Sequence, residues 1–306
     1  MTPAPALDAE AFEAHRPMLF GVAYRMLGSA AAAEDIVQDA YLRARATDAR
    51  DVRSLRAYFV TIVTRLCLDE LKSARTRRQA YVGPWLPEPV PTGNGDLLSP
   101  EATMAERESI SLAFLVLLER LSPVERAAFL LREVFAYDYV EIARVVGRSE
   151  AACRQAFRRA RLRLAEGRRR FRATAEEHRR MTVSFLKAAG EGDLEVLVAL
   201  LAEDVVAWMD GGGRRPGTAR NPIAGADRVA RFIAGIVAGS AQWSDAGRIE
   251  LAEVNGELGV ILRDPAGAPA GVVVLEVAGG CVTAVRAIWN PDKLTRFVRP
   301  APASSS

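Results

Sequence analysis

The sequence contains few of the residues that hold metal ions. It has two histidines, and its three cysteines are Cys67, Cys153 and Cys281 in a chain of 306 residues. These cysteines are far apart and match no metal-binding spacing. We therefore expect no metal site and no cofactor. So few scattered thiols are typical of a reducing compartment, and we expect the protein in the cytoplasm.

Long apolar runs are absent as well. No run of about 18 apolar residues occurs, which is the length that a membrane-spanning helix requires. The first ten residues have neither a basic start nor an apolar core, so we expect no signal peptide and no membrane partner. Half of the residues are apolar, as in ordinary globular proteins, and 306 residues are enough for two or three small domains.

Basic residues are concentrated in two places, although the net charge is only +3. Ten arginines and only two acidic residues lie between Arg148 and Arg172. Clustered arginine at two sites indicates two surfaces that face phosphates. The alternative is that each cluster is only the solvated end of a helix. The second cluster consists of Lys72, Arg75, Arg77 and Arg78.

Composition divides the chain into segments of different character. Residues 81–100 contain five prolines and three glycines and are predicted to form a linker. We expect helices on both sides of it, over residues 10–80 and 101–175, because apolar residues recur there at helical spacing. Residues 180–298 combine helix and strand patterns, and residues 299–306 are predicted to be a disordered tail.

A helix-turn-helix unit is predicted around Gly147. Asp138 and Glu141 form a capping-box pattern at the start of a short helix, and Gly147 is placed to end that helix in the left-handed conformation. Ser149 then caps a second helix over residues 150–163. The second helix of such a unit enters the major groove of DNA. The alternative is an ordinary helical hairpin with a basic exposed face.

The helix that precedes this unit begins with its own capping pattern. Ser122 is a suitable N-cap, Pro123 suits the first helical position, and Glu125 closes a capping box. The pattern predicts a helix over residues 123–135.

Several stretches of the two helical segments resemble regions 2 and 4 of bacterial extracytoplasmic-function (ECF) sigma factors. Their order and separation over residues 12–170 carry the resemblance, which implies an alternative sigma factor that directs RNA polymerase core to specific promoters. The similar stretches are GSAAAAEDIVQDAY at 28–41 for regions 2.1–2.2, LRAY at 55–58 and LCLDELK at 66–72 for regions 2.3 and 2.4, and DYVEIA at 138–143 with RRARLR at 158–163 for region 4.

The resemblance implies roles for individual residues. Region 2 would bind the clamp helices of the polymerase β′ subunit, and region 4 would bind the flap of the β subunit. The residues for the clamp helices would be Asp35, Gln38 and Asp39. The residues that hold the melted −10 element would be Arg53, Arg56, Tyr58, Arg65, Asp69, Lys72, Arg75, Arg77 and Arg78. The residues that read the −35 element would be Ser149, Glu150, Ala151, Arg154, Gln155, Arg158 and Arg159.

Some of these residues have simpler interpretations. The acids of the first set could merely be solvated, and Tyr58 could be a core residue. The basic residues of the second set would hold phosphates, which gives affinity without sequence information. Arg154 and Arg158 lie one helical turn apart, where they can reach phosphates or guanine edges.

The chain continues well beyond the two sigma regions, and the pattern there resembles the SnoaL-like fold, an α+β cone with a pocket. The sequence therefore predicts a multi-domain protein with two all-α sigma domains, the second with the helix-turn-helix, and a C-terminal SnoaL-like domain. Hairpin turns are predicted at Asn255-Gly256 and Gly279-Gly280. Helices are expected at residues 183–189, 194–202 and 228–237, and strands at 205–209, 249–254, 258–262, 271–277 and 282–288.

Three short motifs resemble a subgroup of ECF sigma factors that has this fused domain and no separate anti-sigma partner. They are WLPEP at 85–89, DGGGR at 210–214 and NPDKL at 290–294. The linker motif is expected to be exposed and to dock into a partner groove. The alternative is ordinary loop structure for all three. The expected regulatory contacts are Trp85, Leu86, Pro87, Asp210, Gly211, Gly212, Gly213, Arg214, Asn290, Pro291, Asp292 and Lys293.

Catalysis by the C-terminal domain is not expected. SnoaL-like enzymes use an acid/base pair, often Asp and His, and no histidine follows His178. Asp210, Asp227 and Asp292 are available, but nothing in the sequence marks a pair with shifted pKa values. A small ligand in this domain is an open possibility. Two alternatives to a sigma factor also remain: a one-component helix-turn-helix regulator with a ligand-sensing domain, and a SnoaL-type enzyme with a helical leader.

Overall fold

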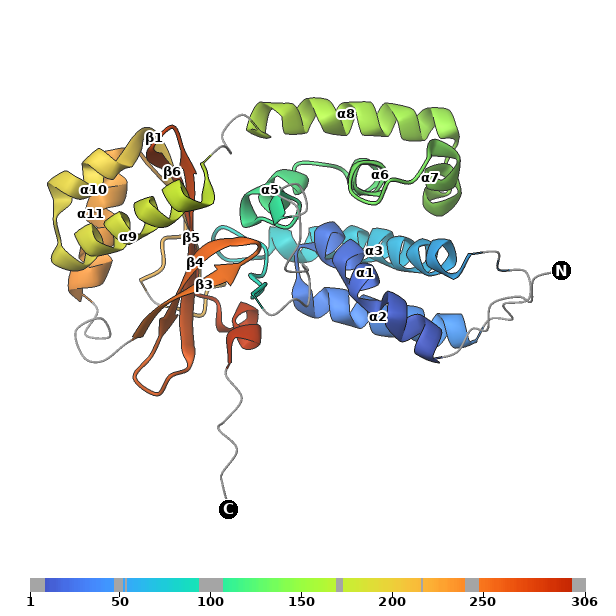
Figure 1. Cartoon of the computed structure of the whole chain (residues 1–306), viewed down its shortest axis with the longest axis horizontal. Coiled ribbons are helices and arrows are strands. Elements are labelled where there is room, and N and C mark those ends of the chain that lie inside the picture. The colour runs from blue at the N-terminus through green and yellow to red at the C-terminus, as the bar shows by residue number, and fades with distance from the viewer. Residues whose placement is uncertain are drawn as a thin grey trace, which may run out of the picture. The chain divides into compact units, whose positions relative to one another are not determined.

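The computed structural model describes residues 9–46, 52, 54–93, 107–168, 173–215, 217–239 and 248–298. The chain folds into two compact units (Figure 1). Unit 1 comprises residues 1–80 and 95–168, and unit 2 comprises residues 81–94 and 169–306. The described part of the expected linker, residues 81–93, is therefore part of the C-terminal unit. The expected tail, residues 299–306, lies outside the described residues.

The first half of unit 1 is a bundle of three helices that pack against one another. The core of the bundle is formed around the fully buried side chains of Phe12, Tyr24 and Phe59. Ser29 is the N-cap of the second helix and accepts a hydrogen bond from the Ala32 amide at 3.2 Å. The helices are α1 (Ala9–Leu27), α2 (Ala30–Arg45) and α3 (Leu55–Gln79).

The second half of unit 1 contains the predicted helix-turn-helix. Both predicted capping boxes are confirmed, one between Ser122 and Glu125 and one between Asp138 and Glu141. Gly147 ends its helix with φ 68°, as expected for a left-handed C-cap. The helices are α5 (Leu112–Leu118), α6 (Pro123–Glu133), α7 (Tyr139–Val146) and α8 (Glu150–Arg168).

Buried arginines join the two halves of unit 1. Arg126 on α6 is 3% exposed and donates to the Met26 carbonyl of α1 at 2.6 Å and to Glu119 at 2.8 Å. Arg25 on α1 is also buried and donates to the Ser109 hydroxyl at 2.9 Å. A buried charge is tolerated only where it is paired, so these contacts specify how the two halves pack.

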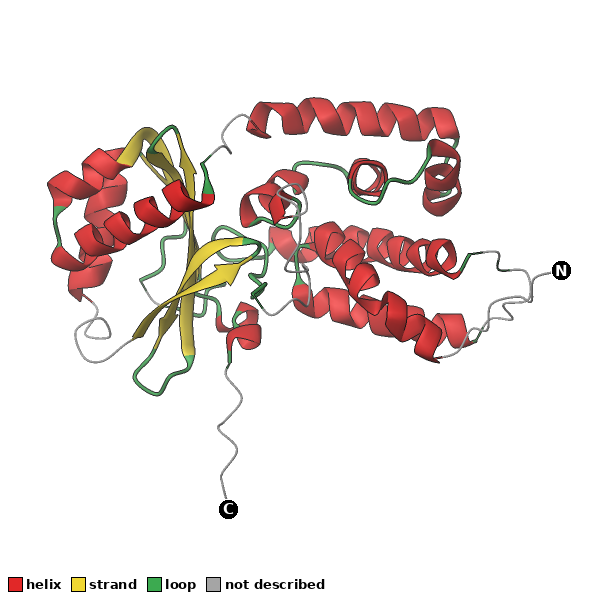
Figure 2. Ribbon diagram, in the orientation of Figure 1, coloured by secondary structure: helices red, strands yellow, loops and turns green. Residues whose placement is uncertain are grey.

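Unit 2 is an α+β domain, which confirms the predicted fold class. Its sheet has the strand order β2-β1-β6-β5-β4-β3, with β1 parallel to β6 and the other neighbours antiparallel. Three helices pack on one face of the sheet (Figure 2). The strands are β1 (Leu201–Asp210), β2 (Ile223–Ala224), β3 (Arg248–Val254), β4 (Glu257–Arg263), β5 (Pro269–Ala278) and β6 (Cys281–Ile288). The helices are α9 (Ala175–Glu191), α10 (Leu194–Leu200), α11 (Ala226–Gly239) and the short 3₁₀ helices η1 (Pro291–Lys293) and η2 (Thr295–Phe297).

Both predicted hairpin turns are confirmed, whereas the bounds of two predicted helices are wrong. Asn255 and Gly256 have φ angles of 54° and 76°, so the turn between β3 and β4 is of the type that Asn-Gly favours. The helix expected over residues 183–189 is part of the longer α9 (Ala175–Glu191). The helix expected over residues 194–202 ends at Leu200. The reason is that Leu201 is already in β1, where it pairs with Val282 of β6.

The two faces of the sheet have different coverings. Apolar residues such as Phe185, Leu197 and Ile233 fill the space between the helices and one face. Side chains alternate between faces along a strand, so Met209 points to the helices and the neighbouring Asp210 points to the other side. Within unit 2, the segment from Tyr81 to Thr92 binds the rest of the unit through Asp210 and through the β3–β4 hairpin.

Candidate functional site

The acidic set on α2 lies on the exposed face of that helix. Asp35, Gln38 and Asp39 are exposed, whereas Ile36 and Val37 between them are buried. None of the three polar residues takes part in capping the helix. Their side chains are therefore presented by a fixed scaffold and are available to a partner.

The basic set of α3 is divided between solvent and internal contacts. Arg56 is exposed and lies over the Tyr137 ring at 5.9 Å, while Tyr58 is half-buried beside Phe59. Asp69 and Lys72 are exposed and form an ion pair at 2.8 Å. This pair lowers the pKa of the Asp69 carboxyl, chiefly through the hydrogen bond from Lys72. Of Arg75 and Arg77 only the backbone is described, and Arg53 lies outside the described residues.

Two arginines of this set bind carbonyl groups of unit 1. Arg65 donates to the carbonyls of Arg144 at 3.0 Å and Val145 at 3.1 Å, at the end of α7. A cation suits this position, because the last carbonyls of a helix lack partners and carry the negative end of the dipole. Arg78 donates to the Leu27 carbonyl at 2.8 Å and pairs with Glu119. In this conformation both guanidinium groups hold the two halves of unit 1 together.

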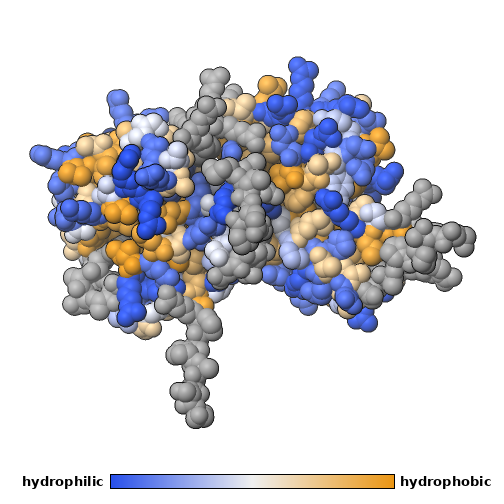
Figure 3. All heavy atoms as spheres, in the orientation of Figure 1, coloured by the Kyte–Doolittle hydropathy of each residue, from blue (hydrophilic) through white to orange (hydrophobic). Residues whose placement is uncertain are grey.

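The second helix of the helix-turn-helix presents polar and basic side chains to solvent. Ser149, Ala151, Arg154, Gln155, Arg158 and Arg159 are exposed, and Glu150 is half-buried. Ser149 caps the helix by accepting from the Ala152 amide at 3.2 Å. Figure 3 shows hydrophilic side chains over the region of α7 and α8. This is the arrangement expected of a helix that approaches DNA.

The arginines of α8 differ in their partners. Arg154 pairs with Glu150 and lies over the Tyr139 ring at 4.5 Å. Arg159 donates to Glu125 at 2.8 Å, and so does Arg163 at 2.6 Å. Arg158 makes no ion pair within the part of the chain that the structure describes. Glu125 thus fixes α8 against the start of α6 and leaves Arg158 available.

Glu125 combines a capping role with two ion pairs in a buried position. Its carboxylate also accepts from the Ser122 amide at 3.0 Å. Burial acts to raise the pKa of Glu125, but the hydrogen bonds from Arg159 and Ser122 and the charge of Arg163 outweigh it, so the pKa lies below its ordinary value. A carboxyl with a lowered pKa stabilises the fold above its unfolded pKa, and this contribution is lost as the pH falls through the folded pKa.

Glu125→Gln is expected to lower the free energy of unfolding by about 1–3 kcal/mol at pH 7, because glutamine keeps the capping box but loses both charged hydrogen bonds. The loss should diminish as the pH falls below about 4.3, the ordinary value for a glutamate in the unfolded chain, and should vanish once the folded carboxyl of the parent is protonated too. Urea unfolding between pH 7 and pH 3 measures both. Glu141→Gln is the control, since Glu141 closes the equivalent capping box of α7. Equal losses in the two variants would contradict the role of the arginines.

The linker and two motifs of unit 2 meet at one buried carboxylate. Asp210 has no exposed surface. It accepts hydrogen bonds from the Tyr81 hydroxyl, from the Leu86 amide at 2.8 Å and from the Lys293 Nζ at 2.7 Å. Burial and the hydrogen bond to Asp210 raise the pKa of Tyr81, which therefore stays a donor. The Asp210 carboxylate is shielded from solvent, and it is stable there because hydrogen-bond donors surround it.

Lys293 and Asn290 complete this site. The Lys293 ammonium also donates to the Leu86 carbonyl at 2.5 Å and lies over the Trp85 ring at 4.4 Å. Asn290 donates from its side-chain amide to the Tyr81 hydroxyl at 3.0 Å. The backbone amides of Trp289 and Asn290 both donate to the Asp210 carbonyl, at 2.7 and 3.0 Å. We call the set Tyr81, Trp85, Leu86, Asp210, Asn290 and Lys293 the Asp210 site.

The glycines after Asp210 allow other groups to approach the backbone. A Cβ atom on Gly212 would lie 2.4 Å from the Asn290 amide nitrogen and 3.0 Å from the Tyr81 hydroxyl. One on Gly211 would lie 2.7 Å from the Thr218 hydroxyl. Gly212 and Gly213 also have φ angles of 57° and 72°, which favour glycine.

The remaining motif residues lie around this centre. Arg214 and Asp292 form an exposed ion pair at 3.2 Å. Pro291 occupies the first turn of η1, which Asn290 caps, and Pro87 is buried.

A second attachment holds the end of the linker segment on the β3–β4 hairpin. The Val90 amide donates to the Asn255 side-chain oxygen at 2.9 Å, and the Asn255 amide donates to the Val90 carbonyl at 2.9 Å. The Thr92 amide donates to the Glu253 carbonyl at 3.1 Å, and its hydroxyl accepts from the Gly256 amide at 2.9 Å. The segment is thus bound at both ends.

The expectation that the linker motif is exposed is corrected for Leu86. This residue is 2% exposed, and Trp85 is half-buried, because the segment binds the C-terminal unit of its own chain. Sequence reasoning missed Tyr81, Thr92 and Asn255. Asn255 was already explained as a turn residue, so nothing in the sequence indicated that it also binds the linker. A single tyrosine before a proline-rich stretch does not indicate its partner.

No described helix is long and apolar enough to cross a membrane. Among the described residues, no group of three or more His, Cys, Asp and Glu side chains is placed to hold a metal ion.

Comparison with known proteins agrees with these features. Residues 11–77 match Sigma-70 region 2, and residues 111–164 match Sigma-70 region 4. The chain is 40% identical over 299 residues to the ECF RNA polymerase sigma factor SigJ of Mycobacterium tuberculosis, with 94% of each protein covered. It is 32% identical over 290 residues to the probable ECF sigma factor SigI of the same species, with 93% of each covered.

The crystal structure of M. tuberculosis SigJ is similar over the whole fold. It has a TM-score of 0.74 and 39% identity, and the match covers 94% of this chain and 99% of that one. The chain therefore belongs to the ECF sigma factors, which direct RNA polymerase core in the initiation of transcription.

Proposed function

We propose that the two halves of unit 1 make the contacts of this sigma factor with polymerase and promoter DNA. We also propose that unit 2 modulates these contacts by holding the linker. The acids on α2 bind the clamp helices of the β′ subunit, and the second half of unit 1 binds the flap of the β subunit. The basic residues of α3 hold the melted −10 element, and α8 reads the −35 element. The exposure of the α2 acids and of the arginines of α8 supports the assignments of these two helices.

The observation that carries the regulatory part is the Asp210 site. The segment that joins the two sigma regions is bound to unit 2 from Tyr81 to Thr92. Extended, this segment would reach about 40 Å, at roughly 3.4 Å per residue. While the segment is bound to the rest of unit 2, it cannot extend to that length. Unit 2 therefore sets how far regions 2 and 4 can separate, as an element with a bound and a released state.

Internal contacts of unit 1 oppose the same separation. Arg65 and Arg78 make contacts that hold the two halves together, yet both belong to the set proposed to hold −10 phosphates. Release of the linker would free these guanidinium groups for DNA. Regulation then resides within one chain, and no separate anti-sigma factor is required.

Run-off transcription with core polymerase and the full chain tests the proposal. The template carries a promoter mapped from transcription start sites that appear on overexpression. We expect a transcript that requires both the chain and the promoter. Promoter-specific DNA binding by the chain alone, with no transcript when core is added, would instead favour a one-component regulator.

Arg158→Ala is expected to weaken binding of the holoenzyme to its cognate −35 element by about 1–3 kcal/mol if Arg158 reads a base. The loss should vanish on a promoter already altered at that base. If the side chain holds only phosphate, binding should weaken equally on both sequences. Fluorescence anisotropy at one fixed salt concentration measures the difference.

Arg159→Ala serves as the comparison, because the Arg159 guanidinium is already engaged by Glu125. We expect it to change stability more than DNA discrimination. Unchanged affinity of the Arg158→Ala variant for the cognate element would remove Arg158 from the DNA-binding set.

A further inference from the structure

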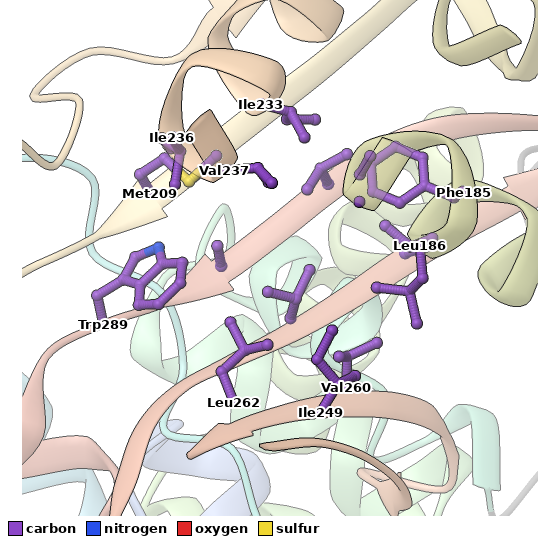
Figure 4. Close-up of a pocket in the computed structure, with 16 residues that line it drawn as sticks. Phe185, Leu186, Met209, Ile233, Ile236, Val237, Ile249, Val260, Leu262 and Trp289 are labelled. Carbon is purple, nitrogen blue, oxygen red and sulfur yellow. The ribbon is translucent and has the colours of Figure 1, made fainter. Parts of the chain in front are cut away.

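Unit 2 contains an apolar pocket between its helices and its sheet. Side chains from α9, α11 and the strands β1, β3, β4, β5 and β6 surround it, and Figure 4 shows them pointing toward a shared space. The space that these side chains surround, including the open solvent at its mouth, is about 690 Å³. Labelled lining residues include Phe185, Ile236, Met209, Leu262 and Trp289.

The chemistry of the lining is uniform. All of the lining side chains are apolar, and the indole of Trp289 supplies their only nitrogen or oxygen atom. Protein interiors rarely keep empty spaces larger than a water molecule, and water has no partners on such walls. A charged ligand group would lose its hydration here without gaining a hydrogen bond. We propose that this pocket binds a neutral, apolar small molecule.

The pocket is also connected to the Asp210 site, and this part of the inference rests on the proposed function. Met209 and Trp289 line the pocket, and the residues that follow them, Asp210 and Asn290, bind the linker on the other side of the sheet. The Trp289 amide donates to the Asp210 carbonyl at 2.7 Å. A ligand that moves the Trp289 ring or the end of β1 therefore changes the geometry that holds Tyr81 and Leu86.

The position of the Trp289 ring is closely determined. A Cβ atom on Gly271 would lie 2.5 Å from the Trp289 ring, so the ring packs directly on the glycine backbone. The Arg215 guanidinium lies 5.1 Å from the ring centre. A ligand that displaces this ring therefore disturbs its packing on Gly271 and Arg215.

Binding is tested with the neutral fluorophore N-phenyl-1-naphthylamine and the full chain. We expect saturable fluorescence enhancement. Ala189→Phe fills the pocket from α9 and should weaken binding about tenfold or more. Val183→Phe places the same side chain on the same helix at a residue that is 46% exposed, and it should leave binding unchanged. Absence of saturable binding, or equal binding by the folded Ala189→Phe variant, overturns the site.

A second variant covers the case in which Ala189→Phe does not fold. Val273→Thr keeps the side-chain volume and places a hydroxyl in the pocket, and we expect several-fold weaker binding. The ligand class is tested by displacement of the fluorophore. Neutral 1-decanol should displace it at roughly tenfold lower concentration than decanoate at pH 8. Equal displacement by the two compounds would overturn the neutral class.

Coupling to the linker is measured by hydrogen exchange of the peptide that contains residues 81–93. Saturating 1-decanol should change its exchange in the parent and not in the Ala189→Phe variant. If the fluorophore binds and exchange in this peptide stays the same, the coupling is wrong although the pocket is a binding site. Failure of the proposed function would be distinct, because transcription would then not respond to release of the linker itself.

Discussion

Asp210→Ala is expected to release the first part of the linker, Tyr81 to Leu86, from the rest of unit 2 and to lower the free energy of unfolding of that unit by about 3–5 kcal/mol. The variant leaves the Lys293 ammonium, 11% exposed, without its carboxylate. It also removes the acceptor of the Leu86 amide and the Tyr81 hydroxyl. Each buried donor that loses its partner costs about 1–3 kcal/mol. The Leu86 amide and the Tyr81 hydroxyl lie on the linker, so the linker loses much of its attachment at this site.

Two measurements check this expectation. Hydrogen exchange of the peptide that contains residues 81–93 should accelerate by one to two orders of magnitude at Leu86, in line with the loss of about 1–3 kcal/mol at that amide. Run-off transcription with core polymerase should change several-fold. Unchanged exchange would show that Asp210 does not hold the linker, and unchanged transcription with accelerated exchange would show that the linker does not regulate.

A double-mutant cycle separates the ion pair from the rest of the site. Lys293→Met keeps the length of the side chain and removes its charge. Combined with Asp210→Asn, it replaces the charged pair by groups of similar volume, which is often nearly neutral for stability. We expect each single variant to lose more stability than the double variant. Additive losses would mean that Lys293 and Asp210 act independently, against the 2.7 Å contact between them.

The sequence predicted features that depend on neighbouring residues. The capping boxes at Ser122 and Asp138, the left-handed turn at Gly147 and the hairpin at Asn255 are each determined by a few adjacent side chains, and each is confirmed. The hairpin strands of unit 2 were predicted with the turn residues between them. The helix end after Leu200 was missed because Leu201 is recruited into β1 by β6, far away in the sequence.

Contacts between distant segments could not be predicted in this way. Charge clustering identified Arg78 and Arg159 as basic surface residues, and the family resemblance added Arg65. Their partners, however, are carbonyls of α1 and α7 and a carboxylate of α6. The same limit applies to the linker. Its apolar residues suggested an exposed docking motif, whereas Leu86 is buried within its own chain, because the acceptor that binds its amide, Asp210, lies 124 positions away.

Charge reversal of the acids on α2 is expected to have the largest effect on capture of core polymerase. In the double variant Asp35→Lys/Asp39→Lys, attraction to a basic partner surface is replaced by repulsion, and juxtaposed like charges cost several kcal/mol. We therefore expect affinity for core to fall at least about 100-fold. Affinity capture of core at one salt concentration measures this. In the parent, affinity should also decrease as salt is raised.

The fold of the variant should be preserved, since both residues are exposed and neither caps α2. They are spaced i, i+4, so one like-charged pair replaces another and the helix itself gains or loses little. The control is Glu191→Lys/Glu195→Lys, which makes the same change in net charge at exposed positions of unit 2. Binding of −35 DNA through α8 should remain in both variants. Equal capture of core by the α2 variant and the control would show that these acids do not form the polymerase-binding surface.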